Sequence, residues 1–447
     1  MSKAVDDYIN DFMAGLEKRN PAETEFHQAV REVACSVAPI YLDREDWVKD
    51  QLLERLTEPD RIVSFRVPWE TDDGMIRANR AWRVQFNHAV GPYKGGLRFS
   101  DSVTESVLKF LGFEQTFKNA LTGLPMGGGK GGSNFNPKGK SEREVMRFCQ
   151  SLMNELHRHI GEDIDVPAGD MGVGPREISF LFGQYIKINN RWAGVMTGKG
   201  ICFGGSAMRT EATGWGVVYF LRAMLHRIGE DIEGRTFCIS GAGNVAIHAA
   251  QKVLDCKGTV LSLSDSDGTL YFRDGMSRDD LDAIDTLKSE GGSLADYDGK
   301  GTFRKGKTPW TIKCDVALPC ATQNEMGDDD AKALIDNGVI AIVEGANMPL
   351  AADAVERVRK AKILYAPGKA ANAGGVAVSG LEQTQNAMRV SWSGDEVNKR
   401  LVEIMEDIHG RCLEHGTTSG GHVDYVDGAN IASFLKVASA VRSYGVW

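Results

Sequence analysis

Three lysines and one aspartate could carry proton-transfer chemistry. Lys130 lies within the glycine-rich stretch LTGLPMGGGKGGSN, and Asp170 lies within a second one, PAGDMGVG. Glycine allows close approach to the backbone, so a lysine in such a stretch can be pressed against a ligand or buried. Burial and nearby like charges lower the pKa of a lysine toward neutrality, which suits proton transfer or carbonyl chemistry. We predict this role for Lys130 with Asp170 as partner base, although a turn aspartate is an equally good interpretation of Asp170 from the sequence alone.

A basic set of Lys94, Lys118 and Lys130 could hold a dicarboxylate together with Gln115. Gln115 and Lys118 are three residues apart in a predicted helix over 103–122, so they share one face. Lys94 lies in GPYKGG, which we interpret as a loop. Any one of these lysines alone would be better explained as a solvated surface residue. The three lysines and Gln115 taken together, with their ordered spacing, favour a binding site for a dicarboxylate.

Gly127-x-Gly129-x-x-Gly132 matches the dinucleotide fingerprint, but a helix precedes it where a strand is required. The P-loop pattern also fails, because Leu124 replaces its first glycine and Gly131 follows the lysine. We interpret this stretch as a loop that carries Lys130.

A second fingerprint, Gly241-x-Gly243-x-x-Ala246, has the correct context. A predicted strand over 236–240 precedes it, a helix over 245–255 follows, and Asp265 ends the next strand. The glycines let a pyrophosphate approach the helix N-terminus, where free N–H groups favour anions. The sequence therefore predicts a bound dinucleotide. Asp265 by itself favours NAD, whereas the flanking hydroxyls of Ser264 and Ser266 could donate to the 2′-phosphate of NADP.

The elements that position these residues indicate an α/β protein. Residues 4–57 read as helices and 61–86 as a β-hairpin. From 236 onward, short apolar strands alternate with helices, which predicts a parallel sheet covered on both faces, as in a Rossmann-like doubly wound domain. A glycine-rich region at 194–205 suggests a domain boundary.

Composition excludes several classes. The chain has 447 residues and a net charge of −9, which argues against a nucleic-acid partner. No apolar run is long enough to cross a membrane, and the first residues lack the apolar core of a signal peptide. Eight scattered cysteines without a C-x-x-C pattern fit reduced thiols in a cytoplasmic protein, and we expect no metal site.

Together these stretches resemble the hexameric glutamate dehydrogenases, especially the bacterial and fungal NADP-type enzymes. The resemblance spans most of the chain in the family's order, and the matching stretches are GPYKGGLRFS, KFLGFEQTFKNALTGLPMGGGKGG, DVPAGDMGVG, RTEATGWG, SGAGNVA, ALPCATQNE, EGANMP and APGKAANAGGVAVSGLEQTQN.

The resemblance implies a role for each matching position. Lys130 matches the catalytic lysine, and Asp170 matches the aspartate that moves protons. The residues that match substrate contacts are Lys118 and Gln115 for the α-carboxylate, Lys94 and Ser379 for the side-chain carboxylate, and Gly169 through its backbone. The residues that match cofactor contacts or line the nicotinamide are Thr213, Gly241, Gly243, Asn244, Val245, Ser264, Asp265, Asn347 and Asn372.

The resemblance also implies the organisation and the reaction. We expect a substrate-binding and oligomerisation domain over 1–204, completed by 424–447, and a Rossmann-like dinucleotide domain over 205–423. The expected activity is reversible oxidative deamination of L-glutamate to 2-oxoglutarate and ammonia, in a homohexamer. Ser264–Ser266 favour NADP over NAD, with Lys288 or Arg278 as a possible cationic partner. The alternatives are the same chemistry with NAD, a related amino-acid dehydrogenase, or a nucleotide-sensing scaffold that has lost catalysis.

Overall fold

The computed structural model describes residues 3–446, and these divide into two compact units. The first unit comprises 3–207, Val378–Val397 and 430–446, and the second comprises Met208–Ala377 and Asn398–Ala429. Both units mix helices with a β-sheet, so the chain has the predicted α/β fold.

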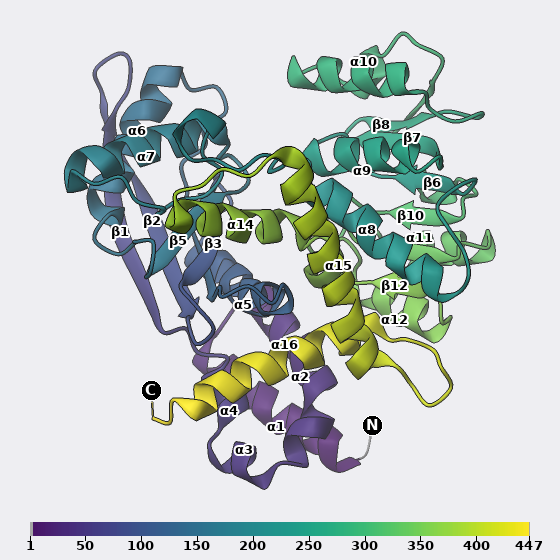
Figure 1. Ribbon diagram of the computed structural model, residues 1–447, viewed down its shortest axis with the longest axis horizontal. Helices are drawn as coiled ribbons and strands as arrows, with labels where there is room; N and C mark the ends of the chain where they lie inside the picture. Colours follow the sequence, from purple (N-terminus) through teal and green to yellow (C-terminus); the bar gives the residue numbers. More distant parts are fainter. Residues whose placement is uncertain (1–2, 447) are drawn as a thin grey trace. The chain divides into compact units, whose positions relative to one another are not determined.

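The first unit is built on a five-stranded sheet in the order β1-β2-β4-β3-β5. The predicted hairpin is present, because β1 and β2 pair antiparallel from Arg61↔Gln85 to Glu70↔Ile76. β4 is antiparallel to β2 and parallel to β3, and β3 is parallel to β5. Figure 1 labels β1, β2, β3 and β5 of this sheet. The bounds are β1 Arg61–Glu70, β2 Ile76–Asn87, β3 Tyr93–Phe99, β4 Gly128–Ser133 and β5 Asp165–Gly169.

Two central strands, β3 and β4, contradict the sequence prediction, which interpreted the stretches around Lys94 and Lys130 as loops. Their glycines are there because neighbouring atoms leave no space for side chains. A Cβ on Gly95 would lie 1.7 Å from the carbonyl oxygen of Gly129, and one on Gly128 would lie 2.0 Å from Thr116 Oγ1. Glycine is a poor strand former, but here only glycine permits this approach.

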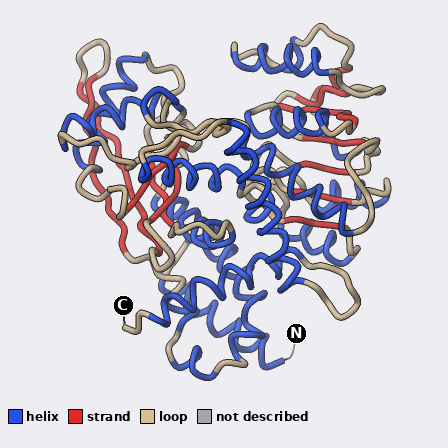
Figure 2. Tube along the Cα trace, in the orientation of Figure 1, coloured by secondary structure: helices blue, strands red, loops and turns tan. Residues whose placement is uncertain are grey.

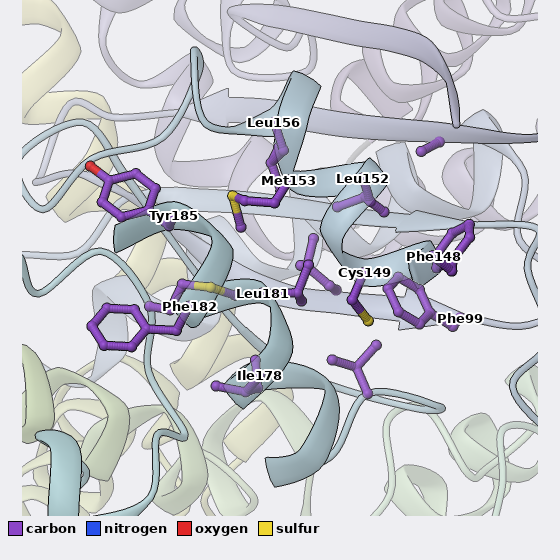
Figure 3. Packing of buried hydrophobic residues seen from close by; sticks show 14 of the residues in the cluster. Phe99, Phe148, Cys149, Leu152, Met153, Leu156, Ile178, Leu181, Phe182 and Tyr185 are labelled. Atoms are coloured by element: carbon purple, nitrogen blue, oxygen red, sulfur yellow. The ribbon is translucent and has the colours of Figure 1, made fainter. Parts of the chain in front are cut away.

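Helices cover both faces of this sheet. On one face α5 packs closely, since a Cβ on Gly112 of α5 would lie 3.4 Å from Val84 of β2. On the other face Leu97 and Phe99 of β3 join a core with Phe148 and Leu152 of α6 and further residues of α7 (Figure 3). The helices of this part of the chain are α1 Lys3–Arg19, α2 Thr24–Leu42, α3 Glu45–Lys49, α4 Leu52–Arg55, α5 Glu105–Leu121, α6 Glu142–Leu156 and α7 Pro175–Asn189.

The second unit holds a seven-stranded sheet in the order β12-β11-β10-β6-β7-β8-β9. The strands from β12 to β7 are parallel, which confirms the predicted parallel sheet. β8 and β9 add an antiparallel edge that the sequence did not predict. The bounds are β6 Thr236–Ile239, β7 Thr259–Asp265, β8 Gly268–Tyr271, β9 Thr302–Lys305, β10 Val316–Leu318, β11 Ala341–Val343 and β12 Leu364–Ala366.

Helices flank this sheet, as the strands and helices of Figure 2 show. On one face α11 and α12 form a core with Cys238 of β6, Ala317 of β10 and Ile342 of β11. α8 packs against α9, because a Cβ on Gly214 would lie 2.5 Å from the backbone nitrogen of Ala249. The helices wholly within this unit are α8 Ala212–Arg227, α9 Asn244–Asp255, α10 Arg278–Ser289, α11 Asp328–Asp336, α12 Ala352–Lys360 and α13 Gly368–Ala371.

Three late helices contain residues of both units: α14 Gly374–Met388, α15 Gly394–Gly416 and α16 Tyr425–Ser443. The predicted domain boundaries gave 378–397 to the dinucleotide domain, whereas this segment packs with the first unit. The physical reason is a fully buried ion pair, in which Glu382 of α14 lies 2.7 Å from Lys199. Among residues 3–446, no helix combines the length and the apolar character needed to cross a membrane.

Candidate active site

Lys130 and Asp170 lie in direct contact in the first unit. Lys130 Nζ is 3.1 Å from Asp170 Oδ2, although the two residues are forty positions apart in the sequence. Lys130 is on β4, and Asp170 directly follows β5. The Lys130 side chain is 6% exposed and that of Asp170 is 23% exposed, so the aspartate remains accessible from the solvent side.

Strand register places the other cations of this site on the same face of the sheet. Arg98 of β3 pairs with Gly132 of β4, two residues from Lys130. Side chains two or four residues apart on a strand point the same way, so Lys130, Arg98 and Lys94 share one face. Helix α5 packs on this face, since a Cβ on Gly128, two residues from Lys130 on β4, would lie 2.0 Å from Thr116 Oγ1 of α5.

The electrostatics of the pair suit proton transfer. Burial lowers the pKa of Lys130, the Asp170 carboxylate opposes that effect, and Arg98 adds to it. Burial also opposes the charge on Asp170, but Lys130 and Arg98 outweigh it and hold the pKa of Asp170 well below its ordinary value. Asp170 is therefore ionised at neutral pH, and Lys130 loses its proton more readily than an exposed lysine does.

Lys94 is completely buried, and its ammonium group donates to Thr197 Oγ1 at 2.8 Å. The sequence analysis did not single out Thr197, because no local motif connects residues that are 103 positions apart. A buried cation beside a hydroxyl provides donors for one carboxylate group.

Asn119 connects Lys94 to α5 and was also missed. Its amide donates to the carbonyl oxygen of Lys94 at 3.0 Å, and Gln115 donates to its side-chain oxygen at 2.6 Å. Lys118 lies in the last turn of the same helix and is partly exposed. Gly169 immediately precedes Asp170, and a Cβ there would lie 2.5 Å from the carbonyl oxygen of Val173.

Ser379 lies in the first unit and is 1% exposed. Its neighbour Gly380 lies close to Leu124 and Met126, because a Cβ on it would be 2.6 Å from Leu124 Cδ1. Glu382, one turn later, accepts from the backbone N–H of Gly198 at 2.9 Å, beside Thr197. The middle of α14 is therefore fixed to the segment that contacts Lys94.

The second unit contains a pocket of about 770 Å³ around the Gly241–Gly243 turn. Gly241 has a φ of +83°, which favours glycine, and its N–H donates to Ser264 Oγ at 3.0 Å. Gly243 precedes α9, and a Cβ there would meet nothing within 4 Å. The helix N-terminus is thus open to a ligand, and the residues present fit the phosphates of a dinucleotide.

Asp265 lies in the same pocket, but protein groups already occupy its oxygens. Lys288 donates to Oδ2 at 3.1 Å and the N–H of Leu294 donates to the same atom at 2.8 Å, while the N–H of Asp267 donates to Oδ1. Burial opposes the charge, and these hydrogen bonds outweigh it and lower the pKa of Asp265. Arg278 lies elsewhere, because it pairs with Asp255 and Asp282.

The remaining predicted cofactor residues also lie in the second unit. Asn244 donates to the carbonyl oxygen of Thr210 at 2.8 Å, and Val245 follows it in the first turn of α9. Thr213 faces Gly375, where a Cβ would lie 2.3 Å from Thr213 Oγ1. Asn372 donates to the side-chain oxygen of Asn347 at 3.1 Å and so orders that loop.

Comparisons with known proteins agree with this geometry. The family described as Glutamate/Leucine/Phenylalanine/Valine dehydrogenase matches residues 204–445, and the Glu/Leu/Phe/Val dehydrogenase, dimerisation domain, matches residues 59–187. The NADP-specific glutamate dehydrogenase of Escherichia coli (strain K12) is 54% identical over 98% of both chains. The NAD-specific glutamate dehydrogenase of Bacteroides fragilis (strain YCH46) is 52% identical over 98% of this chain and 99% of that protein. The crystal structure of Plasmodium falciparum glutamate dehydrogenase superposes with a TM-score of 0.96 at 46% identity, over 99% of this chain and 96% of the other.

Proposed function

Because this chain belongs to the Glu/Leu/Phe/Val dehydrogenase family, we propose that it is an NADP-dependent glutamate dehydrogenase. It interconverts L-glutamate with 2-oxoglutarate and ammonia. The observation that carries the proposal is the contact between Lys130 and Asp170 on the sheet face that also bears Lys94. This arrangement combines a proton-transfer pair with a buried cation for a second carboxylate.

In the first unit, one set of residues would bind the substrate and another would transfer protons. Lys94 and Ser379 would hold the side-chain carboxylate, while Lys118 and Gln115 would hold the α-carboxylate and Gly169 would contribute its backbone. Holding both ends fixes the substrate Cα in one orientation, which lowers the entropic part of the barrier. The dinucleotide, when bound, supplies the acceptor for the hydride that leaves Cα.

Lys130 and Asp170 would carry the proton steps. Neutral Lys130 takes a proton from a water molecule as that water attacks the iminium carbon of the oxidised substrate. Ionised Asp170 takes the hydroxyl proton of the resulting carbinolamine and passes it to the nitrogen, so that the carbonyl forms, the C–N bond breaks and ammonia leaves. The lowered pKa of Lys130 supports this assignment, because a general base must be deprotonated at the working pH.

Lys288 supports NADP as the cofactor. It lies in the pocket beside Asp265 and offsets the charge with which that carboxylate would repel a 2′-phosphate. The cofactor contacts of the second unit would then be Gly241, Gly243, Asn244, Val245 and Ser264 near the phosphates and the adenosine ribose, and Thr213, Asn347 and Asn372 near the nicotinamide.

The decisive experiment follows loss of NADPH absorbance with 2-oxoglutarate and ammonium, with NADH in parallel. We expect turnover with NADPH and at most weak turnover with NADH. A panel of 2-oxo acids tests the related amino-acid dehydrogenases, and buried Lys94 favours 2-oxoglutarate over apolar substrates. Absence of turnover with every substrate, together with intact dinucleotide binding, would favour a scaffold that has lost catalysis.

We also propose a homohexamer in the cytoplasm. The match to a dimerisation domain over 59–187 supports association, and so does β1, an edge strand that can pair with another chain. The eight cysteines, all free thiols, fit a reducing compartment. Light scattering should give six times the 48.8 kDa mass of the chain. A monomer at micromolar concentration would contradict the assembly.

A further inference from the structure

Arg98 makes a contact that neither the sequence motifs nor the proposed reaction explains. Its Nε donates to Asp170 Oδ2 at 2.8 Å, and this is the same oxygen that lies 3.1 Å from Lys130 Nζ. The Arg98 side chain is 17% exposed. One carboxylate oxygen therefore serves two cations, only one of which can lose its proton at ordinary pH.

This sharing has a consequence for Lys130. If Asp170 had Lys130 as its one cationic partner, deprotonation of Lys130 would leave a largely buried carboxylate uncompensated, which is costly. Arg98 stays charged, so Asp170 keeps a partner when Lys130 becomes neutral. Arg98 also repels the ammonium form of Lys130 directly, and it contributes to the lowered pKa of that group.

We propose that Arg98 is a positioning residue that holds Asp170 through every protonation state of Lys130 and allows Lys130 to act as a neutral amine. The inference rests on the proposed glutamate dehydrogenase reaction. Arg98 need not touch substrate, because it acts through Asp170.

Other charged groups near Lys130 are arranged differently. Arg83 of β2 and Asp165 of β5 form a fully buried ion pair on the opposite face of the sheet. Lys94 of β3 is bonded to Thr197. Glu114 and Lys118 lie on α5, which packs against β4. Among these, Arg83 also lowers the pKa of Lys130, after Arg98.

The test compares pH profiles of kcat/KM for glutamate oxidation in the wild type, Arg98→Lys, Arg98→Met and Arg98→Gln. Activity requires neutral Lys130, so it rises with pH through the pKa of that group. This rise forms the acidic limb of the pH profile. Removal of the Arg98 charge in the Met and Gln variants should shift the acidic limb to higher pH by about 1 unit or more. Arg98→Lys keeps the charge and should leave the limb within a few tenths of a unit.

A role limited to folding would lower activity equally at every pH. An unshifted limb in a folded Met or Gln variant overturns the inference, and circular dichroism establishes folding. A second readout needs no turnover: the pH dependence of Lys130 trinitrophenylation, followed by peptide mass spectrometry, reports its pKa directly. An upward shift in a charge-removed variant supports the role of Arg98 even if glutamate is not the substrate, and an unchanged value refutes it.

Discussion

The ammonium group of Lys288 donates to the carboxylate of Asp265 across 3.1 Å, inside the pocket beside the Gly241–Gly243 turn. A carboxylate at the end of this strand ordinarily accepts the ribose hydroxyls of NAD. Here that carboxylate orients a lysine, and we propose that this lysine provides the positive charge that a 2′-phosphate requires.

Lys288→Ala should therefore reduce kcat/KM with NADPH by roughly tenfold or more and change the value with NADH little, since a charge-assisted hydrogen bond to phosphate is lost. Steady-state kinetics with both cofactors measure this. Arg278→Ala is the matched control, because Arg278 pairs with Asp255 and should affect neither cofactor. Equal losses with NADPH and NADH would mean that Lys288 supports the fold rather than the phosphate.

Thr197→Val should raise the KM for glutamate by about tenfold and leave kcat within about twofold. The substitution keeps the side-chain shape but removes the hydroxyl that lies 2.8 Å from Lys94 Nζ. A lost hydrogen bond to a charged group costs about 1.5 kcal/mol, which is roughly tenfold in affinity. Thr384→Val is the control, because that hydroxyl donates to Gly380 within its own helix. An unchanged KM in Thr197→Val would remove Thr197 from the substrate site.

Gly95→Ala should destabilise the protein by about 3 kcal/mol or more, since the new methyl group would lie 1.7 Å from the carbonyl oxygen of Gly129 and force β3 away from β4. Gly183→Ala is the matched control: this glycine is exposed in α7 and has nothing within 4 Å, so alanine should stabilise the helix by up to about 1 kcal/mol. Urea unfolding monitored by circular dichroism compares them. Equal stability of the two variants would show that β3 and β4 tolerate separation.

His409 should make the protein sensitive to acid. It is 7% exposed and bonded to Tyr425, and burial lowers its pKa to about 4. The unfolded chain binds this proton near pH 6.5, so stability falls as pH drops from 6.5 to 4, by up to roughly 3 kcal/mol. His409→Gln should unfold with a weaker pH dependence across this range, which urea titrations at several pH values measure. The same slope in wild type and variant would assign the acid sensitivity to other groups.

Local sequence patterns predicted the second unit well. The strand, turn and helix around Gly241 are specified within some thirty residues. The alternation of strands and helices after them predicted a parallel sheet, and the structure confirms it. The strands that carry Lys94 and Lys130 were missed because glycine is rare in strands. The contacts that require glycine there are made by α5 and by the neighbouring strand, which are distant in the sequence.

Candidate residues in glycine-rich motifs were visible in the sequence, but their partners were not. The pairing of three strands brings Lys130 and Arg98 to Asp170. Lys94 forms a hydrogen bond with Thr197, which is more than a hundred residues away in the sequence. The sequence could not decide between Lys288 and Arg278, which lie on the same helix; the structure places Lys288 in the pocket. Periodicity identifies elements, whereas sheet register brings side chains together.

The most direct measurement is the turnover of Lys130→Ala alongside its affinity for NADPH, the latter by fluorescence titration. Lys130 contacts Asp170 in the first unit, whereas the Gly241–Gly243 pocket belongs to the second, so cofactor affinity should stay within about twofold. Turnover should fall by at least about a thousandfold, because the proton-accepting amine is gone. Near-normal turnover in this variant, with NADPH bound as in the wild type, would contradict the assignment of Lys130 as the catalytic base.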